Sequence, residues 1–357
     1  MIKKMNILMF TRCMGEGGTE KIIIQLCEIL LKANCGVFIC ADGGKSEEIV
    51  RAMGIKFYKI PDMQTKNPLV ALEIMKTINK ILDENEIDII HVHHRMAAFY
   101  CQIMRLNKDY KLLATSHNTF HDKKIFTKFA YKRFNIVACG EKVKNNLETE
   151  YKLNDVTVIH NAVEAYRKQI QISPELKADK EKGFFMIANI GRINEQKGME
   201  YFVHAYKKVW QRHKQVKFYI VGTGIKEKEI QQLAIEEKAN IQFMGFRTDI
   251  QSIIAQMDLI VLSSLWEGFP LIPIETFSMG KTIVATDIDG TSEIIQDGIN
   301  GCLVQPKNVE QLADKICWMI EHDEQKTKME KEALKTYNNR FSIDVFAQKY
   351  VNLYRSL

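Results

Sequence analysis

The stretch SSLWEGFPLIPIE, residues 263–275, decides the fold of this chain of 357 residues. It holds two carboxylates, Glu267 and Glu275, with a glycine, an aromatic residue and two prolines between them. The run DLIVL before it, residues 258–262, predicts a short buried strand, and residues 271–279 predict a helix. A strand, a tight turn and a helix N-terminus present free backbone N–H groups and a positive dipole end, which suit an anionic ligand. In the first turns of that helix, Glu275 is placed to accept hydrogen bonds from sugar hydroxyls.

Apolar runs alternate with helical patterns on both sides of this stretch. Expected strands are residues 5–10, 37–40, 56–60, 87–92, 111–116, 136–139, 184–190, 217–221, 241–244, 282–286 and 301–304. The longest helical patterns are residues 19–33, 68–85 and 198–214. Such βα alternation predicts parallel sheets with right-handed crossovers.

A polar, lysine-rich tract interrupts the alternation at residues 165–183 and contains Pro174. The expected fold class is therefore α/β, with two doubly wound, Rossmann-like domains that face each other across a cleft. Ligands of such sheets bind outside the carboxyl ends of the strands. The expected boundaries are residues 1–165 for the N-terminal, acceptor-side domain, 166–183 for the linker, 184–340 for the C-terminal domain and 341–357 for a final helix.

The composition is that of a soluble globular protein, with 46% hydrophobic and 26% charged residues. A net charge of +6 is too mild to indicate nucleic acid as a partner. No apolar run is long enough to span a bilayer, and residues 5–10 are too short for a signal sequence. We therefore expect a cytoplasmic protein. Its eight cysteines form no Cys-x-x-Cys pair, so we expect them to be reduced and mostly buried.

One local cluster of positive charge alternates with apolar residues. Its members are Lys123, Lys124, Lys128, Lys132 and Arg133, with Ile125, Phe126, Phe129, Tyr131 and Phe134 between them. One interpretation is a helix that lies on an anionic membrane, which would place the protein peripherally on the inner face. The other is a solvated helix whose aromatic residues face the core. We prefer the second, because basic amphipathic patterns are common on soluble helices.

Two cations mark the strand-to-helix turn at residues 190–198. Arg192 follows the end of an expected strand, and Lys197 precedes the next expected helix. Arginine offers a bidentate fork and lysine a point charge, so the pair suits a diphosphate held without a metal. Either residue alone would more often be a surface charge.

The glycine loop GEGGTE, residues 15–20, follows the first expected strand. It begins like the dinucleotide-binding fingerprint, but Glu20 stands where the third glycine belongs, so the fit is poor. Gly17 and Gly18 could instead allow a phosphate or a sugar to approach the backbone closely. The alternative is an ordinary glycine pair in a loop.

Four histidines lie at the expected ends of two strands, His91, His93, His94 and His117. No carboxylate or cysteine completes a recognisable metal-ligand spacing, so we expect no metal there. We expect His91 to point into the sheet packing and His93 to extend into the cleft. The short Asp287-Ile288-Asp289 pattern lies next to a glycine, and we interpret it as a set of residues that favour a turn.

These residues together resemble the GT-B glycosyltransferases, and within them the retaining glycosyltransferase family 4 of bacterial glycan synthesis. The resemblance extends over nearly the whole chain, and the two-glutamate element is its most specific part. It rests on residues 17–20, 91–93, His117, 161–164, 191–192, 197–198, 221–224, Gly245, 267–270, Glu275, Gly280, 285–287, Glu293, Gly298 and Gly301. Departures at Ala162, Glu164, Thr282 and Asp289 affect linker and turn geometry.

The resemblance implies a role for each matching residue. Arg192 and Lys197 correspond to residues that bind the donor diphosphate, Glu275 to one that binds the ribose, and Glu267 to one that engages the transferred sugar. The donor-binding set also includes Gly17, Gly18, Gly222, Gly268, Phe269, Pro270 and Leu271. His93 corresponds to a residue at the transferring sugar and completes the expected catalytic set of His93, Glu267, Arg192 and Lys197. His117 and Arg95 are expected on the acceptor side, where loops 95–99 and 118–124 shape the site.

The implied reaction transfers a sugar from a nucleotide-diphosphate sugar, expected to be a UDP-sugar, to an acceptor hydroxyl with retention. No carboxylate stands out as a nucleophile, so a front-face route is preferred, with no metal or other cofactor. A glycan or lipid-linked acceptor for cell-surface polysaccharide or glycoconjugate synthesis is expected, and the last helix should return to the first domain. Two alternatives stay open: a non-catalytic protein that binds nucleotide sugars, and an NAD-dependent oxidoreductase built on the first glycine loop.

Overall fold

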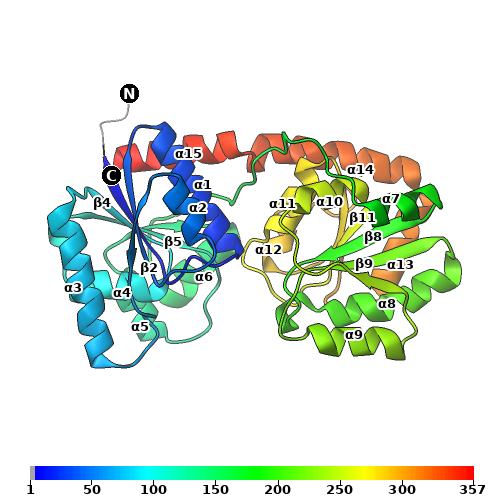
Figure 1. Cartoon of the computed structure of the whole chain (residues 1–357), viewed down its shortest axis with the longest axis horizontal. Coiled ribbons are helices and arrows are strands. Elements are labelled where there is room, and N and C mark those ends of the chain that lie inside the picture. Colours follow the sequence, from blue (N-terminus) through cyan, green and yellow to red (C-terminus); the bar gives the residue numbers. More distant parts are fainter. Residues whose placement is uncertain (1–4) are drawn as a thin grey trace. The chain divides into compact units, whose positions relative to one another are not determined.

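The computed structural model describes residues 5–357. The chain divides into two compact units, one that runs to Asn161 and resumes at Phe346–Leu357, and one that spans Ala162–Val345. Each unit is built around one parallel sheet with helices along it (Figure 1). The α/β, doubly wound class expected from the sequence is confirmed.

The first unit contains a seven-stranded parallel sheet in the order β3-β2-β1-β4-β5-β6-β7. Its strands are β1 (Asn6–Phe10), β2 (Gly36–Ala41), β3 (Lys56–Lys59), β4 (Ile89–Val92), β5 (Lys111–Ser116), β6 (Asn135–Ala138) and β7 (Val156–Val158). Its helices are α1 (Gly18–Lys32), α2 (Glu47–Ala52), α3 (Pro68–Glu84), α4 (Arg95–Ile103), α5 (Lys124–Tyr131) and α6 (Glu141–Tyr151). The strand order reverses between β1 and β4, and ligands of such sheets bind at this switch point.

The last helix, α15 (Ile343–Ser356), places two buried tyrosines against the first sheet. The hydroxyl of Tyr354 lies 2.6 Å from His91 Nδ1, and the hydroxyl of Tyr350 lies 3.1 Å from Thr115 Oγ1. His91 and Thr115 belong to β4 and β5. These contacts assign most of the C-terminal helix to the first unit.

The second unit contains a six-stranded parallel sheet in the order β10-β9-β8-β11-β12-β13. Its strands are β8 (Phe185–Ile190), β9 (Val216–Val221), β10 (Ile241–Phe243), β11 (Leu259–Leu262), β12 (Ile283–Thr286) and β13 (Cys302–Val304). Its helices are α7 (Pro174–Glu181), α8 (Met199–Arg212), α9 (Glu227–Glu236), α10 (Ile250–Gln256), α11 (Leu271–Ser278), α12 (Asp289–Ser292), α13 (Val309–Glu321) and α14 (Asp323–Thr336). Here the order reverses between β8 and β11.

Three elements of the first unit were not expected from the sequence. Residues 95–99 were expected to form a loop, but they begin α4. The physical reason is the cap: His94 Nδ1 accepts a hydrogen bond from the Met96 backbone N–H at 3.2 Å, a role that serine, threonine, aspartate or asparagine usually fills. Helix α6 and strand β7 were also missed.

The tract expected to be a linker, residues 166–183, lies within the second unit. Its backbone is bound to α10, because the N–H of Gln171 donates to Ser252 Oγ at 2.7 Å and the N–H of Ser173 donates to Gln256 Oε1 at 3.1 Å. Leu176 of α7 is 1% exposed. The polar composition of the tract concealed these anchoring contacts.

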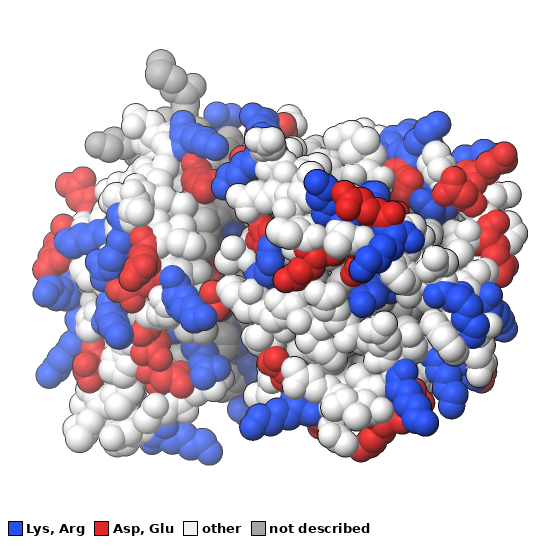
Figure 2. Space-filling view, turned by 45° about the vertical axis from the view of Figure 1, so that its right-hand side comes forward, with Lys and Arg blue, Asp and Glu red and all other residues white. Residues whose placement is uncertain are grey.

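The surface and the cysteines fit the composition. On the face shown in Figure 2, basic and acidic side chains are interspersed and no large area of one sign stands out.

All eight cysteines are free thiols, and seven of them are buried, as expected. Among residues 5–357, no helix combines the length and the apolar character needed to cross a membrane.

Candidate functional site

Two loops of the second unit meet at its switch point, one after β8 and one after β11. Gly198 has φ +52°, and a Cβ there would lie 2.4 Å from the Ser263 carbonyl oxygen, so no larger residue fits without a shift. Ser263 Oγ donates to the Gly198 carbonyl at 2.8 Å and accepts from Asn189 Nδ2 at 2.9 Å. The Leu265 N–H donates to the Gln196 carbonyl at 2.7 Å. Backbone and side-chain bonds therefore fix one loop on the other.

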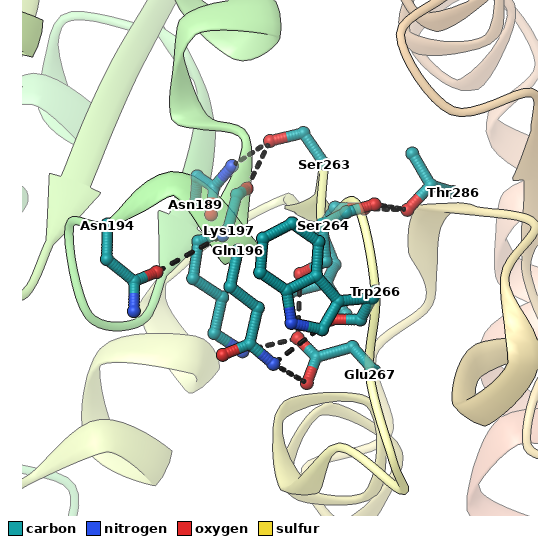
Figure 3. Close-up of polar contacts among 10 residues, drawn as sticks. Asn189, Asn194, Gln196, Lys197, Ser263, Ser264, Trp266, Glu267 and Thr286 are labelled. Atoms are coloured by element: carbon teal, nitrogen blue, oxygen red, sulfur yellow. Dashed lines mark hydrogen bonds and ion pairs between the residues drawn. The ribbon is translucent and has the colours of Figure 1, made fainter. Parts of the chain in front are cut away.

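The Glu267 carboxylate lies at the centre of these loops (Figure 3). Its Oε1 accepts from Lys197 Nζ at 2.5 Å and from Ser264 Oγ at 2.7 Å, and its Oε2 accepts from Gln196 Nε2 at 3.3 Å. The side chains of Lys197 and Glu267 are 14% and 7% exposed. A buried carboxylate is stable only with such partners. The structure thus pairs two residues that were expected to have separate tasks, one at the diphosphate and one at the sugar.

Gln196 and Ser264 were not singled out from the sequence. Both are neighbours of residues that were, since Gln196 precedes Lys197 and Ser264 lies three positions before Glu267. A polar residue next to a predicted site residue is a weak signal. Only the pairing of two loops that are 70 residues apart shows what these two side chains do.

Arg192 lies in the same β8 loop but is exposed. Its guanidinium makes no hydrogen bond or ion pair within the described chain, residues 5–357, so it can meet an incoming anion directly. Gly222, the first residue after β9, packs against this loop: a Cβ on it would lie 1.9 Å from the Gly191 carbonyl oxygen. Close backbone packing explains the glycine at position 222, and its predicted role in donor binding stays a prediction.

The turn after Glu267 leads directly into α11. Gly268, Phe269 and Pro270 are buried, and no side chain caps the first turn of the helix, which begins at Leu271. Uncapped N–H groups at a helix N-terminus favour an anion. Glu275 lies in the second turn and is 5% exposed, on a helix whose other residues are apolar or small polar ones. A buried carboxylate on such a helix indicates a functional position.

The first unit contains a pocket of about 800 Å³ at its own switch point. His93 and His117, after β4 and β5, line it together with Arg95 of α4. The apolar part of its lining comprises Met63, Pro68, Ala71, Met96, Phe99, Tyr100, Phe120, Phe126 and Tyr131. The structure therefore brings together the three residues expected near the transferring sugar and the acceptor, and surrounds them with apolar side chains.

Three histidines extend in a row from the core to this pocket. His91 is bonded through both ring nitrogens, to the Tyr354 hydroxyl at 2.6 Å and to Thr115 Oγ1 at 2.8 Å, as the expected packing position requires. Its ring lies 4.1 Å from that of His93, whose Nδ1 lies 3.1 Å from His117 Nε2.

Burial keeps these histidines neutral. It lowers the pKa of His91 and of His93 well below the ordinary value, and that of His117 to about 4. One hydrogen therefore lies between His93 and His117. The other nitrogen of His93, Nε2, is buried and has no hydrogen-bond partner among residues 5–357. A ligand hydroxyl that reaches this nitrogen would supply the missing partner.

Arg95 makes structural contacts in the pocket wall. Its Nη1 donates to Asp122 Oδ1 and to Thr127 Oγ1, both at 2.8 Å, and its guanidinium lies 4.7 Å from the centre of the Phe120 ring. These contacts fix the loop before α5 against α4. The hydrogen bond from Arg95 also lowers the pKa of the Asp122 carboxyl. An acceptor role for Arg95 stays a prediction.

Gly17 and Gly18 begin α1, with Gly17 as its N-cap. A Cβ on Gly17 would lie 2.5 Å from Glu20 Oε2, so the carboxylate of Glu20 covers the position where a ligand was expected to approach. Glu20 itself lines the pocket of the first unit. The predicted donor contacts of the two glycines stay predictions.

The basic aromatic segment is helix α5. The rings of Phe126 and Phe129 lie 5.0 and 5.9 Å from the ring of Phe99 in α4, so these aromatic residues do pack inward in part. Ile125, however, is 87% exposed, and Leu69 on α3 is 72% exposed. The preferred interpretation of a solvated helix accounts for the aromatic rings and leaves the exposed Ile125 unexplained.

The two aspartates of the Asp-x-Asp pattern, Asp287 and Asp289, are exposed. The Asp287 N–H donates to the Val304 carbonyl at 2.7 Å, and Asp289 begins the short helix α12. Within the part of the chain that the structure describes, no three His, Cys, Asp or Glu side chains are arranged to hold a metal ion.

Comparison with known proteins identifies the family. The model of the family described as Glycosyltransferase Family 4 matches residues 16–167, and the model described as Glycosyl transferases group 1 matches residues 185–322. A curated relative from Escherichia coli, UDP-Gal:alpha-D-GlcNAc-diphosphoundecaprenol alpha-1,3-galactosyltransferase, is 23% identical over 94% of this chain and 93% of its own.

Solved structures share the fold over the whole chain. A glycosyltransferase from Rickettsia africae is 25% identical, with a TM-score of 0.86 over 99% of both chains. Anabaena HepE, solved in complex with UDP, is 20% identical, with a TM-score of 0.85 over 99% of this chain and 100% of its own.

Proposed function

The chain belongs to the GT-B glycosyltransferases of the family 4 type, and we propose that it transfers a sugar from a UDP-sugar to an acceptor hydroxyl with retention of configuration. The observation that carries this proposal is the buried Glu267 site, where a carboxylate, a lysine and an uncapped helix N-terminus meet at the switch point of one sheet. Uridine is supported by the relative from Escherichia coli, whose name specifies UDP-Gal, and by the UDP bound to the Anabaena protein.

The donor is proposed to bind the second unit. Arg192, Lys197 and the first turn of α11 would hold the diphosphate and stabilise the negative charge that develops as it departs. Glu275 would accept hydrogen bonds from the ribose, and Glu267 from the transferred sugar. In the proposed front-face route, the departing phosphate accepts the proton of the attacking hydroxyl, and no metal or other cofactor is needed.

The acceptor is proposed to bind the pocket of the first unit. The buried Nε2 of His93 has no hydrogen-bond partner among residues 5–357 and would bond a sugar hydroxyl that reaches it, whereas Met96, Phe99 and Phe126 offer an apolar wall. A lipid-linked glycan presents both kinds of surface, and the relative from Escherichia coli is named for a diphosphoundecaprenol acceptor. Such an enzyme would contribute to cell-surface polysaccharide or glycoconjugate synthesis.

Peripheral contact with the inner face of an anionic membrane is proposed for α5. Exposed Ile125 stands between Lys124 and Lys128 on this helix, so an apolar side chain could enter the interface while the lysines meet lipid headgroups. Flotation with anionic liposomes should recover the wild type, and Ile125→Ser with Lys128→Glu should reduce the floated fraction. Equal flotation of both proteins, or no flotation of the wild type, would contradict this contact.

The proposed reaction is tested with a panel of nucleotide sugars. The true donor should raise the unfolding temperature, because a ligand that binds only the folded state stabilises it. With an acceptor present, uridine diphosphate should be released, and NMR of the product should show the donor's anomeric configuration. Binding without release would favour the non-catalytic alternative, and stabilisation by NAD(H) instead would favour the oxidoreductase. Activity lost with a chelator and restored by manganese would assign a metal role to Asp287 and Asp289.

A further inference from the structure

The three donors around Glu267 are distributed unequally between its oxygens. Among residues 5–357, Oε1 accepts from the charged Lys197 and from Ser264, whereas Oε2 accepts from Gln196 alone. Gln196 Nε2 also donates to the Trp266 carbonyl at 3.0 Å, so one amide group bridges the carboxylate and its own loop (Figure 3). The carboxylate thus has one charged partner and two neutral ones.

In this arrangement Lys197 has two competing partners, Glu267 in the structure and the diphosphate in the proposed donor complex. The Lys197 ammonium cannot remain on Glu267 and also turn fully to a diphosphate, while Arg192 has no partner to give up among residues 5–357. Removal of the cation from a buried carboxylate is costly unless other groups compensate the charge. A diphosphate, which is more highly charged than one carboxylate, can compete for an ammonium on a flexible four-carbon side chain.

We propose that the Lys197–Glu267 pair is a latch, that is, an ion pair whose partners are exchanged when the donor binds. Gln196 is the positioning residue that holds Glu267 during the exchange. Lys197 turns to the diphosphate, and a hydroxyl of the transferred sugar takes its place on Oε1. The O–H of Ser264 and the Nε2–H of Gln196 remain hydrogen-bonded to the carboxylate, so that it stays charged and oriented toward the sugar hydroxyl. This inference rests on the proposed function, because it requires a nucleotide-diphosphate sugar as donor.

The latch distinguishes the donor from the product that remains after transfer. A nucleotide sugar supplies both the phosphate that attracts Lys197 and the hydroxyl that replaces it on Glu267. Uridine diphosphate supplies the phosphate only, so Glu267 is left with two neutral donors. The return of Lys197 to Glu267 then weakens the hold on the diphosphate and favours product release.

Bonds that do not involve the Gln196 side chain also hold the loop, in addition to the bond from Gln196 Nε2 to the Trp266 carbonyl. The Leu265 N–H donates to the Gln196 backbone carbonyl, and Ser263 Oγ donates to the Gly198 carbonyl at 2.8 Å. These bonds survive a change of the Gln196 side chain. Gln196→Met, which keeps the length and removes the donor, therefore tests positioning with the loop in place.

The experiment measures affinity for uridine diphosphate, and for the nucleotide sugar that stabilises the protein most, by titration calorimetry. In Glu267→Gln the lysine is no longer held by a charge, so we expect uridine diphosphate to bind roughly tenfold tighter than in the wild type, as a charged partner worth about 1.5 kcal/mol predicts. The nucleotide sugar should gain nothing or lose affinity. A gain in affinity for uridine diphosphate without a gain for the nucleotide sugar is the result that the latch predicts.

A double-mutant cycle tests Gln196 itself. Gln196→Met should weaken uridine diphosphate binding by about five- to tenfold in the wild-type background. The free protein still has Lys197 on Glu267, whereas the exchanged carboxylate is left with one neutral donor, so the loss costs more in the bound state. In the Glu267→Gln background the same change should have no effect. A merely structural role would shift both backgrounds equally. The matched control is Gln232→Met on α9, where the exposed amide donates to Glu236, and it should leave both affinities unchanged.

The outcomes separate the latch from the proposed function. Equal affinity of wild type and Glu267→Gln for uridine diphosphate, with turnover of the nucleotide sugar retained in the wild type, overturns the latch alone. Absence of any nucleotide binding overturns both. Should Glu267→Gln fail to fold, Ser264→Ala provides the test: it removes a donor from Glu267 and should weaken uridine diphosphate binding, and unchanged affinity there also overturns the latch.

Discussion

At the scale of single residues, Arg192 and Lys197 differ more than their shared charge suggests. Arg192 is exposed, whereas the Lys197 side chain is 14% exposed and bonded to a carboxylate that is 7% exposed. Removal of an exposed cation changes stability little, whereas removal of one half of a buried pair is strongly destabilising because the other charge is left uncompensated. The two residues can therefore be separated by stability even though both are proposed to bind the diphosphate.

We predict that both alanine variants lose turnover but only one loses stability. Arg192→Ala and Lys197→Ala should each lower kcat by about 10²-fold or more, because each removes charge stabilisation at the leaving group. Lys197→Ala should also lower the free energy of unfolding by about 3–5 kcal/mol, because Glu267 is left buried without its cation. Urea denaturation measures the difference. Lys197→Met combined with Glu267→Gln should recover most of the stability, and equal stability of the two single variants would contradict the buried pair.

The histidine row predicts a pH dependence of stability. The folded pKa values of His91, His93 and His117 lie below the unfolded value of about 6.5, and that of His117 is about 4. Between these values the unfolded chain binds protons that the folded chain does not bind. The contribution of these histidines to the free energy of unfolding is therefore fully present above about pH 7 and decreases as the pH falls. Each histidine contributes up to about 1.4 kcal/mol per pH unit to the slope.

Urea unfolding between pH 7 and pH 5 measures that slope. His117→Asn should reduce the slope, because it removes one of the histidines that bind a proton only in the unfolded chain. His121→Asn replaces an exposed histidine of the same unit and should leave the slope unchanged. A slope that is the same in wild type and His117→Asn would show that the fold does not keep His117 in its neutral form.

At the scale of secondary-structure elements, α15 supports the row of histidines. The Tyr354 hydroxyl is bonded to His91 Nδ1 inside the core, so Tyr354→Phe leaves a buried ring nitrogen without its partner. Such a loss costs about 1–3 kcal/mol, and thermal or urea unfolding should show a decrease of that size. Tyr166→Phe removes a hydroxyl that bonds an exposed backbone carbonyl and is the matched control. No difference between the two variants would argue against the role of α15.

The sequence predicted most strands and long helices because their apolar residues are local and periodic. It missed α4 because the helix begins at a histidine cap, and it missed the anchoring of residues 166–183 because the partners lie more than 80 residues away. In the candidate site the residue types pointed to a diphosphate and a sugar. The pairing of Lys197 with Glu267 could not be predicted, since it depends on how two distant loops pack through Gly198 and Ser263.

At the scale of the whole molecule, the chain assigns different chemistry to its two units. The second unit holds two buried carboxylates, Glu267 and Glu275, and the uncapped turn of α11. The first unit holds a pocket of about 800 Å³ with neutral histidines and an apolar wall. Charged groups suit a nucleotide sugar, and the mixed pocket suits an amphiphilic acceptor. If each unit recognises one substrate, then a change in one unit should alter the binding of that substrate only.

A crossed pair of variants tests this division. Glu275→Gln in the second unit should weaken donor binding by about 10- to 100-fold, because a charged acceptor of a ribose hydrogen bond is worth about 1.5–3 kcal/mol, and acceptor KM should not change. Met96→Gln in the first unit keeps the side-chain length but adds a polar group to the apolar wall, so it should raise acceptor KM while donor affinity by calorimetry stays the same. Donor affinity that falls equally in both variants would show that the two substrates are not recognised by separate units, because a polar group in the acceptor pocket has no direct means to weaken a ribose contact on α11.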